Sequence, residues 1–104
     1  MSGAAARSRI AIDGEMSIYR AGDLKTLLLD ALRQSPALEV DLSGVTELDT
    51  SGLQVLMLAK QTARANGGEL YLQAHSPAVL DVFELLDMGA WFGDALLIAP
   101  AAHA

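Results

Sequence analysis

Apolar and polar residues alternate near the start of the chain and then recur with the period of a helix. Residues 9–13 and 16–20 both alternate, and the Gly-Glu pair between them is a turn signal, so the pattern predicts a short β-hairpin. The next segment has apolar residues three and four positions apart, which predicts an amphipathic helix from Asp23 to the Ser-Pro pair at 35–36. The apolar face of this helix comprises Leu24, Leu27, Leu28, Ala31 and Leu32.

A strand followed by a second helix comes next. Residues 38–42 alternate and predict a strand, and the Ser-Gly pair after them predicts a turn. Residues 45–49 then lead into a helix at 52–65, which the Asn-Gly-Gly run at 66–68 ends. Apolar residues surround much of the first two turns of this helix, so either neighbouring elements or a partner must cover them.

The last part of the chain predicts one more strand and one more helix. Residues 70–74 form the strand pattern, and the Ser-Pro pair at 76–77 starts the helix with its serine as N-cap. Residues 91–94 predict a turn. Residues 96–98 predict either a short final strand or a packed tail.

The predicted elements follow the order β-β-α-β-α-β-α, which is typical of the α/β class. Strands joined through helices pair in parallel by right-handed crossovers, whereas the expected hairpin is antiparallel. We therefore expect a single domain at residues 10–99, with a mixed β-sheet packed with α-helices. Residues 1–9 and 100–104 are expected to be flexible tails.

Composition narrows the classes of function. The chain has 104 residues, of which 52% are hydrophobic, so one packed domain is expected. The net charge of −6, without any cluster of lysine and arginine, argues against nucleic acid and anionic membrane surfaces as partners. No apolar run reaches the roughly 18 residues of a membrane-spanning helix. Without a signal-peptide pattern either, we expect no membrane insertion and a cytoplasmic location.

Groups that could perform catalysis or bind metal are scattered along the sequence. The chain lacks cysteine, which excludes thiolate metal sites. His75 and His103 are isolated, and the sequence contains no nucleophile elbow, phosphate-binding loop or dinucleotide-binding motif. We therefore expect no catalytic residue, no metal site and no cofactor. An enzyme would need a converging base, such as His75 within hydrogen-bond reach of Ser51.

The segment Leu48–Leu53, between a predicted strand and a predicted helix, is the strongest candidate for function. Ser51 is predicted to be the N-cap of the helix, with Gln54 completing a capping box. A hydroxyl at a helix start is also well placed to receive a phosphate, which the helix dipole would stabilise. Gly52 is a costly helix residue unless something approaches the backbone there. Asp49 either orients the hydroxyl or bonds to its own backbone. A structural cap and a phosphorylation site both remain open.

The stretch LEVDLSGVTELDTSGL at residues 38–53 resembles the signature of STAS domains, the anti-sigma factor antagonist family. The shared pattern is a strand ending in Asp-Leu-Ser, followed by Asp-Thr-Ser-Gly-Leu at the start of a helix. The order of elements is similar from Ile10 to Leu97. This resemblance implies a small α/β domain that binds partner proteins and is not an enzyme.

In that family, a switch-type serine kinase phosphorylates the second hydroxyl position of the motif, and the unphosphorylated domain captures an anti-sigma factor. The resemblance thus implies phosphorylation of Ser51. It also implies an anti-sigma factor or the serine kinase as partner, with Mg²⁺-ATP belonging to the kinase. The partner-binding residues that we expect are Asp49, Thr50, Ser51, Gly52, Leu53 and Leu56.

Two subgroups of the family imply different outputs. The segments at residues 16–21, 52–56, 75–79 and 92–94 are similar to STAS proteins associated with bacterial chemotaxis clusters, which implies a chemotaxis signalling protein as partner. The alternative is similarity to the STAS subunit of lipid-transport ABC systems. That alternative implies a constitutively docked domain in which Ser51 is only a helix cap.

Overall fold

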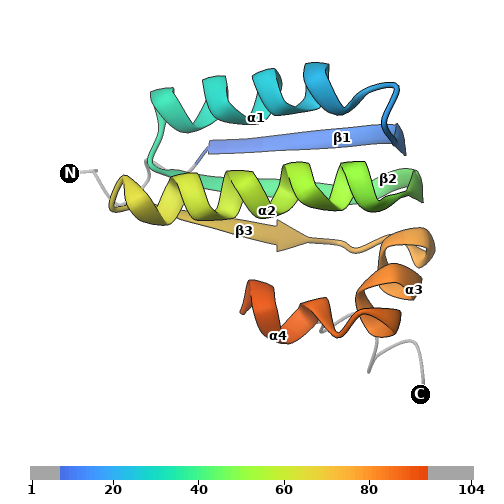
Figure 1. Ribbon diagram of the computed structural model, residues 1–104. Coiled ribbons are helices and arrows are strands. Elements are labelled where there is room, and N and C mark those ends of the chain that lie inside the picture. Colours follow the sequence, from blue (N-terminus) through green and yellow to red (C-terminus); the bar gives the residue numbers. More distant parts are fainter. Residues whose placement is uncertain (1–7, 94–104) are drawn as a thin grey trace.

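A three-stranded parallel sheet lies at the centre of the structure, a computed structural model that describes residues 8–93 (Figure 1). The elements in chain order are β1 (Ser8–Met16), α1 (Ala21–Gln34), β2 (Ala37–Leu48), α2 (Thr50–Ala65), β3 (Glu69–Gln73), α3 (Pro77–Leu85) and α4 (Met88–Phe92). The strands are ordered β1-β2-β3, so each crossover passes through a helix. The predicted α/β single domain is confirmed.

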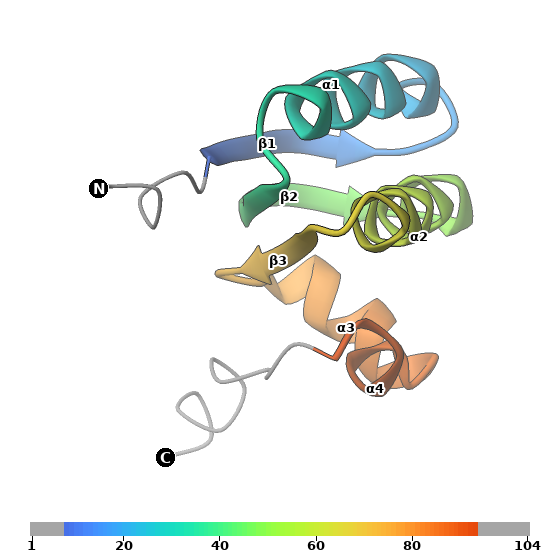
Figure 2. The same cartoon turned by 90° about the vertical axis from the view of Figure 1, so that its left-hand side faces the viewer.

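The core lies between the sheet and the pair α1 and α2, which cover the same face (Figure 2), and it extends to buried residues of α3 and α4. The central strand alternates as the sequence pattern predicts. Leu38, Val40 and Leu42 have no exposed surface, whereas the residues between them are partly exposed on the other face. Val40 pairs in register with Ile10 of β1 and Leu72 of β3, so an apolar row crosses the sheet beneath the helices.

The hairpin expected at residues 9–20 is wrong, because β1 is one continuous strand. The Gly-Glu pair lies inside β1 and makes the strand irregular without ending it. Gly14 has a φ of +82°, and the register with β2 shifts on either side of it. The Arg20 guanidinium donates to the carbonyl oxygens of Asp13 and Glu15, both at 2.7 Å. These bonds fold the chain after β1 into a turn. Within residues 8–93 the sheet is therefore parallel, where we expected a mixed one.

The turn expected at residues 43–44 is also wrong, because β2 continues through it. Gly44 pairs in register with Asp13 of β1. A Cβ at Gly44 would collide with the Asp13 side chain, whose Cγ would lie 2.9 Å away. The glycine thus makes room for a neighbouring strand instead of turning the chain.

The predicted helix boundaries are confirmed at the end of α2 and the start of α3. At the Asn-Gly-Gly run, Gly67 adopts a φ of +79° and the Gly68 N–H donates to the Ala63 carbonyl at 2.8 Å. Ser76 caps α3, because its hydroxyl accepts a hydrogen bond from the Val79 N–H at 3.2 Å.

The termini of the described chain differ from expectation in two places. Residues 8–9, expected in the N-terminal tail, belong to β1. The turn expected at residues 91–94 is wrong for Trp91 and Phe92, which belong to α4, whereas Gly93 lies in a turn. Phe92 of α4 is buried and stacks on Phe83 of α3, with ring centroids 5.2 Å apart, which accounts for the extra helix. The strand or tail expected at residues 96–98 lies outside the described residues.

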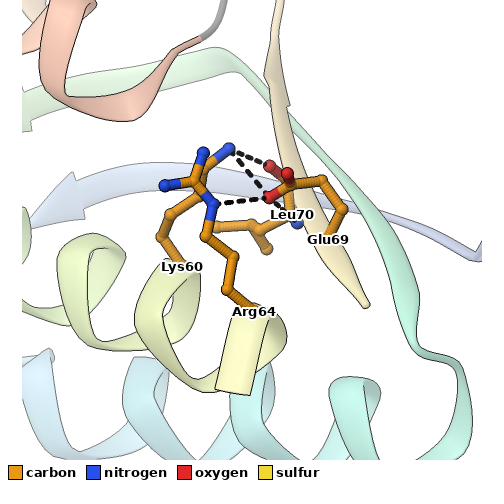
Figure 3. A network of polar contacts seen from close by, with 4 residues as sticks. All are labelled: Lys60, Arg64, Glu69 and Leu70. Carbon is orange, nitrogen blue, oxygen red and sulfur yellow. Dashed lines mark hydrogen bonds and ion pairs between the residues drawn. The ribbon is translucent and has the colours of Figure 1, made fainter. Parts of the chain in front are cut away.

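A buried lysine joins α2 to β3 (Figure 3). The side chain of Lys60 is only 2% exposed, and its ammonium group donates to the Leu70 carbonyl at 2.6 Å and pairs with Glu69 at 3.1 Å. Arg64 contacts the same carboxylate at 3.3 Å. Burial acts to raise the pKa of Glu69, but the Leu70 N–H, Lys60 and Arg64 outweigh it and hold that pKa below its usual value. This network fixes the C-terminal half of α2 against the sheet.

Candidate partner-binding site

An open hollow of about 270 Å³ lies between the N-terminal turns of α1 and α2, which run side by side over the sheet (Figures 1 and 2). Ser51 lies on the α2 side of this hollow, and Lys25 lies on the α1 side. The hollow is lined by Ala21, Gly22, Lys25, Ser51, Gln54, Val55 and Leu58. Ser51, the main candidate from the sequence, therefore borders a surface depression.

The N-cap of α2 is Asp49, so the predicted Ser51 cap and its capping box are wrong. The Asp49 backbone is extended, and its Oδ1 accepts a hydrogen bond from the Gly52 N–H at 3.0 Å. Thr50 and Ser51 are the first two residues of the helix itself. An aspartate is as good an N-cap as a serine, so local preference does not decide between them.

Contacts with the end of β1 select Asp49 as the cap. Its Oδ2 accepts a hydrogen bond from the Ile18 N–H at 3.1 Å, and its own N–H donates to the Met16 carbonyl at 3.1 Å. One carboxylate thus holds both the start of α2 and the turn between β1 and α1. Asp49 therefore has a structural role in positioning both walls of the hollow.

Gly52 is required by the same close approach. A Cβ at this position would collide with the main-chain oxygen of Met16 and lie 2.7 Å from the Met16 Cβ. The expectation that something approaches the backbone at Gly52 is confirmed, and the approaching group is β1 of the same chain.

Ser51 is half-buried at the second position of α2. Within the described chain, its hydroxyl is not involved in capping and makes no hydrogen bond. The amide groups of a first helical turn have no partner inside the helix, and the helix dipole places partial positive charge there. A negatively charged group on Ser51 would therefore be favoured electrostatically by the start of α2.

The other expected partner-binding residues divide into exposed and buried ones. Asp49 and Thr50 are exposed, whereas Gly52, Leu53 and Leu56 are buried, with Leu56 fully inaccessible. The side chains of Leu53 and Leu56 belong to the core and do not reach the surface. Most of the apolar surface of α2 is therefore covered by the domain itself.

Three exposed apolar side chains near Ser51 were not identified as site residues from the sequence. Ile18 and Tyr19, in the turn after β1, are 67% and 87% exposed, and Leu58 on the hollow is 36% exposed. The alternating pattern assigned Ile18 and Tyr19 to a strand, which hid their exposure. The hydrogen bond from the Ile18 N–H to Asp49 places this turn beside the start of α2.

The described residues do not assemble the constellation that an enzyme hypothesis requires. His75 does not line the Ser51 hollow, and its buried Nε2 has no hydrogen-bond partner within residues 8–93. Its ring packs edge-on against Phe83, and burial lowers its pKa. Across the same described range, no group of three or more potential ligands is arranged to hold a metal ion. No helix in that range is long and apolar enough to cross a bilayer.

Comparison with known families agrees with this geometry. A family model described as "Mlab, STAS domain" matches residues 2–98, nearly the whole chain. The chain belongs to the STAS domain family. A solved structure of the anti-sigma factor antagonist SpoIIAA in its unphosphorylated form is similar to this STAS domain, with a TM-score of 0.67 and 20% sequence identity. The match covers 94% of this chain and 88% of that chain, and at this identity it concerns the fold.

Proposed function

We propose that this STAS domain is a non-enzymatic regulatory module of the anti-sigma factor antagonist type, whose partner binding is switched by phosphorylation at Ser51. The observation that carries the proposal is that Asp49, and not Ser51, caps α2. Asp49 caps α2, which leaves the Ser51 hydroxyl beside an open hollow without a structural hydrogen bond in the described chain. A modification of Ser51 therefore leaves the cap in place.

Phosphorylation would change the surface without unfolding the domain. A phosphoserine adds about −1.5 to −2 charges at pH 7. The start of α2 tolerates this charge, because free backbone amides and the helix dipole lie there. A partner that presents carboxylates or apolar groups to the same place does not tolerate it. The net charge of −6 adds to that repulsion, so partner release follows from electrostatics alone.

The proposed docking surface surrounds Ser51. It comprises the exposed Ile18 and Tyr19, together with Thr50, Ser51 and Leu58. The partner on this proposal is an anti-sigma factor or a switch-type serine kinase, or a chemotaxis signalling protein if the output is chemotaxis. The similar solved structure is that of an anti-sigma factor antagonist in an unphosphorylated form, which supports a switch of this class. The kinase supplies Mg²⁺-ATP, and the module acts in the cytoplasm.

The test is a titration of the partner against two Ser51 variants. Ser51→Ala removes the phosphate acceptor and leaves the affinity for the partner unchanged. Ser51→Glu places a negative charge beside the hollow and lowers that affinity. Gln34→Glu is the matched control, because it adds the same charge at an exposed position at the far end of α1, outside the docking surface. Identical affinity of Ser51→Ala and Ser51→Glu for the partner contradicts the proposal.

A second candidate is a constitutive subunit, as in lipid-transport ABC systems. It is favoured by the exposure of Ile18 and Tyr19, because large uncovered apolar side chains are typical of a surface that is covered in a permanent complex. Since Asp49 is the cap, Ser51 would then simply line the hollow. The intact mass of the protein from its native host, with and without phosphatase, separates the two. A phosphate-sized difference at Ser51 favours the switch, and its repeated absence favours the constitutive subunit.

A further inference from the structure

Lys25 stands apart from the other lysine and arginine side chains of the described chain. It is exposed on α1 and lines the hollow opposite Ser51, and no interaction engages it within residues 8–93. The other lysines and arginines in that range are engaged as follows: Arg9 with Glu39 and Asp41, Arg20 with two carbonyl oxygens, Arg33 with Asp30, and both Lys60 and Arg64 with Glu69. Among the described lysines and arginines, the one left without a partner thus lies beside the candidate phosphorylation site.

We propose that Lys25 binds the phosphoryl group of phosphorylated Ser51 across the hollow between α1 and α2. This inference rests on the proposed function of Ser51. An ammonium group on a flexible four-carbon stem binds phosphate as a compact point charge and does not need one fixed geometry. Gln54, which lies on the α2 side of the hollow with Ser51, carries an amide that donates a further hydrogen bond to a phosphoryl oxygen.

The hollow has room for this pair. Its volume of about 270 Å³ is several times the roughly 30 Å³ that one water molecule occupies in the liquid. A phosphoryl group with its three terminal oxygens therefore fits without separating the helices. Asp49 is not among the residues that line the hollow, and its two carboxylate oxygens accept hydrogen bonds from the N–H groups of Gly52 and Ile18.

Capture by Lys25 gives phosphorylation a second effect besides the added charge. The phosphoryl group is drawn into the hollow and joins α2 to α1 through Lys25. A nearby ammonium group favours the dianion over the monoanion, so the second pKa of the phosphoserine falls below its ordinary value of about 6. That pKa is the property that reports the contact directly.

The experiment uses the full chain with phosphoserine incorporated genetically at position 51, so that neither a kinase nor a partner is needed. The pH dependence of the ³¹P chemical shift gives the second pKa of the phosphate. We expect Lys25→Gln to raise it by about half a pH unit, the size that a solvent-exposed ion pair allows. Lys25→Arg keeps the low pKa, because it retains the charge. The difference in phosphate pKa between the parent protein and Lys25→Gln disappears in about 1 M salt, where exposed charges are screened.

Arg33→Gln is the matched control, because it removes a surface charge from the far end of the same helix. It leaves the phosphate pKa unchanged. The inference is overturned if Lys25→Gln and the parent protein have the same phosphate pKa at low ionic strength, or if Arg33→Gln shifts it equally. Failure of the proposed switch is a different result. It appears as equal partner affinity of Ser51→Ala and Ser51→Glu, whatever the phosphate pKa is.

Discussion

The assignment of Asp49 as the cap of α2 predicts a large difference between two neighbouring substitutions. Asp49→Ala removes the hydrogen bond to the Gly52 N–H, and loss of an N-cap costs about 1 kcal/mol. It also removes the bond to the Ile18 N–H. Because this second acceptor is a charged but exposed group, its loss adds about 1 kcal/mol. The total expected loss of unfolding free energy is therefore about 2 kcal/mol.

Ser51→Ala, by contrast, removes a hydroxyl that makes no hydrogen bond in the described chain. Its expected effect is within about 0.5 kcal/mol, as for ordinary surface substitutions. Urea unfolding followed by circular dichroism measures both values, and an unchanged m-value shows that the transition stays comparable. Asp81→Ala controls for the loss of an exposed carboxylate on another helix. A Ser51→Ala variant that loses as much stability as Asp49→Ala refutes the assignment of the cap.

Four further predictions concern packing and pH. Gly52→Ala lowers the free energy of unfolding by about 1–3 kcal/mol, because its Cβ collides with the β1 main chain. The Cβ of Gly22→Ala meets no atom within 4 Å, so that substitution stabilises α1. Thermal melting compares the two variants. Lys60→Ala costs about 1–3 kcal/mol in urea unfolding, because the Leu70 carbonyl loses its donor, whereas Glu69 is partly exposed and keeps Arg64. Because the pKa of Glu69 is lowered in the folded protein, its carboxylate contributes stability above the unfolded pKa of about 4.3, and this contribution is lost as the pH falls. Glu69→Gln therefore flattens the decline of the unfolding free energy at acidic pH. Burial lowers the pKa of His75, so stability declines as the pH falls below about 6.5, and His75→Leu removes that decline.

The elements that depend on local pattern could be predicted from the sequence. The alternation at residues 38–42 gave the central strand, and the spacing of leucines from Leu24 to Leu32 gave α1. Ser76 was recognised as a cap because both the cap and the helix it starts lie within a few residues. In each case the physical cause is contained in the segment itself.

The errors came from contacts between segments distant in sequence. Gly14 and Gly44 carry turn signals locally, but one lies within an irregular stretch of β1 and the other makes room for Asp13. Asp49 and Ser51 are equally good caps by local preference. The choice between them depends on the N–H of Ile18, which lies 31 positions earlier in the chain. No periodicity within one segment contains that information.

The candidate site was predicted in part. The motif located Ser51 and the start of α2, but the burial of Leu53 and Leu56 became visible only when the sheet and helices were assembled. Lys25 was not identified, because its proximity to Ser51 arises from the packing of α1 against α2. The sequence spacing of these two residues carries no sign of it.

The central claim, that phosphorylation of Ser51 controls partner binding, is tested most directly by a quantitative pull-down from the native host. The bait proteins are the unmodified domain, the domain with phosphoserine at position 51, and a control with phosphoserine in place of Gln34, at the far end of α1. We predict that one partner binds the unmodified domain and the position-34 control alike, and that its recovery falls at least about tenfold, or 1.4 kcal/mol, with phosphate on Ser51. Equal recovery of that partner by the unmodified and the Ser51-phosphorylated domains contradicts the claim.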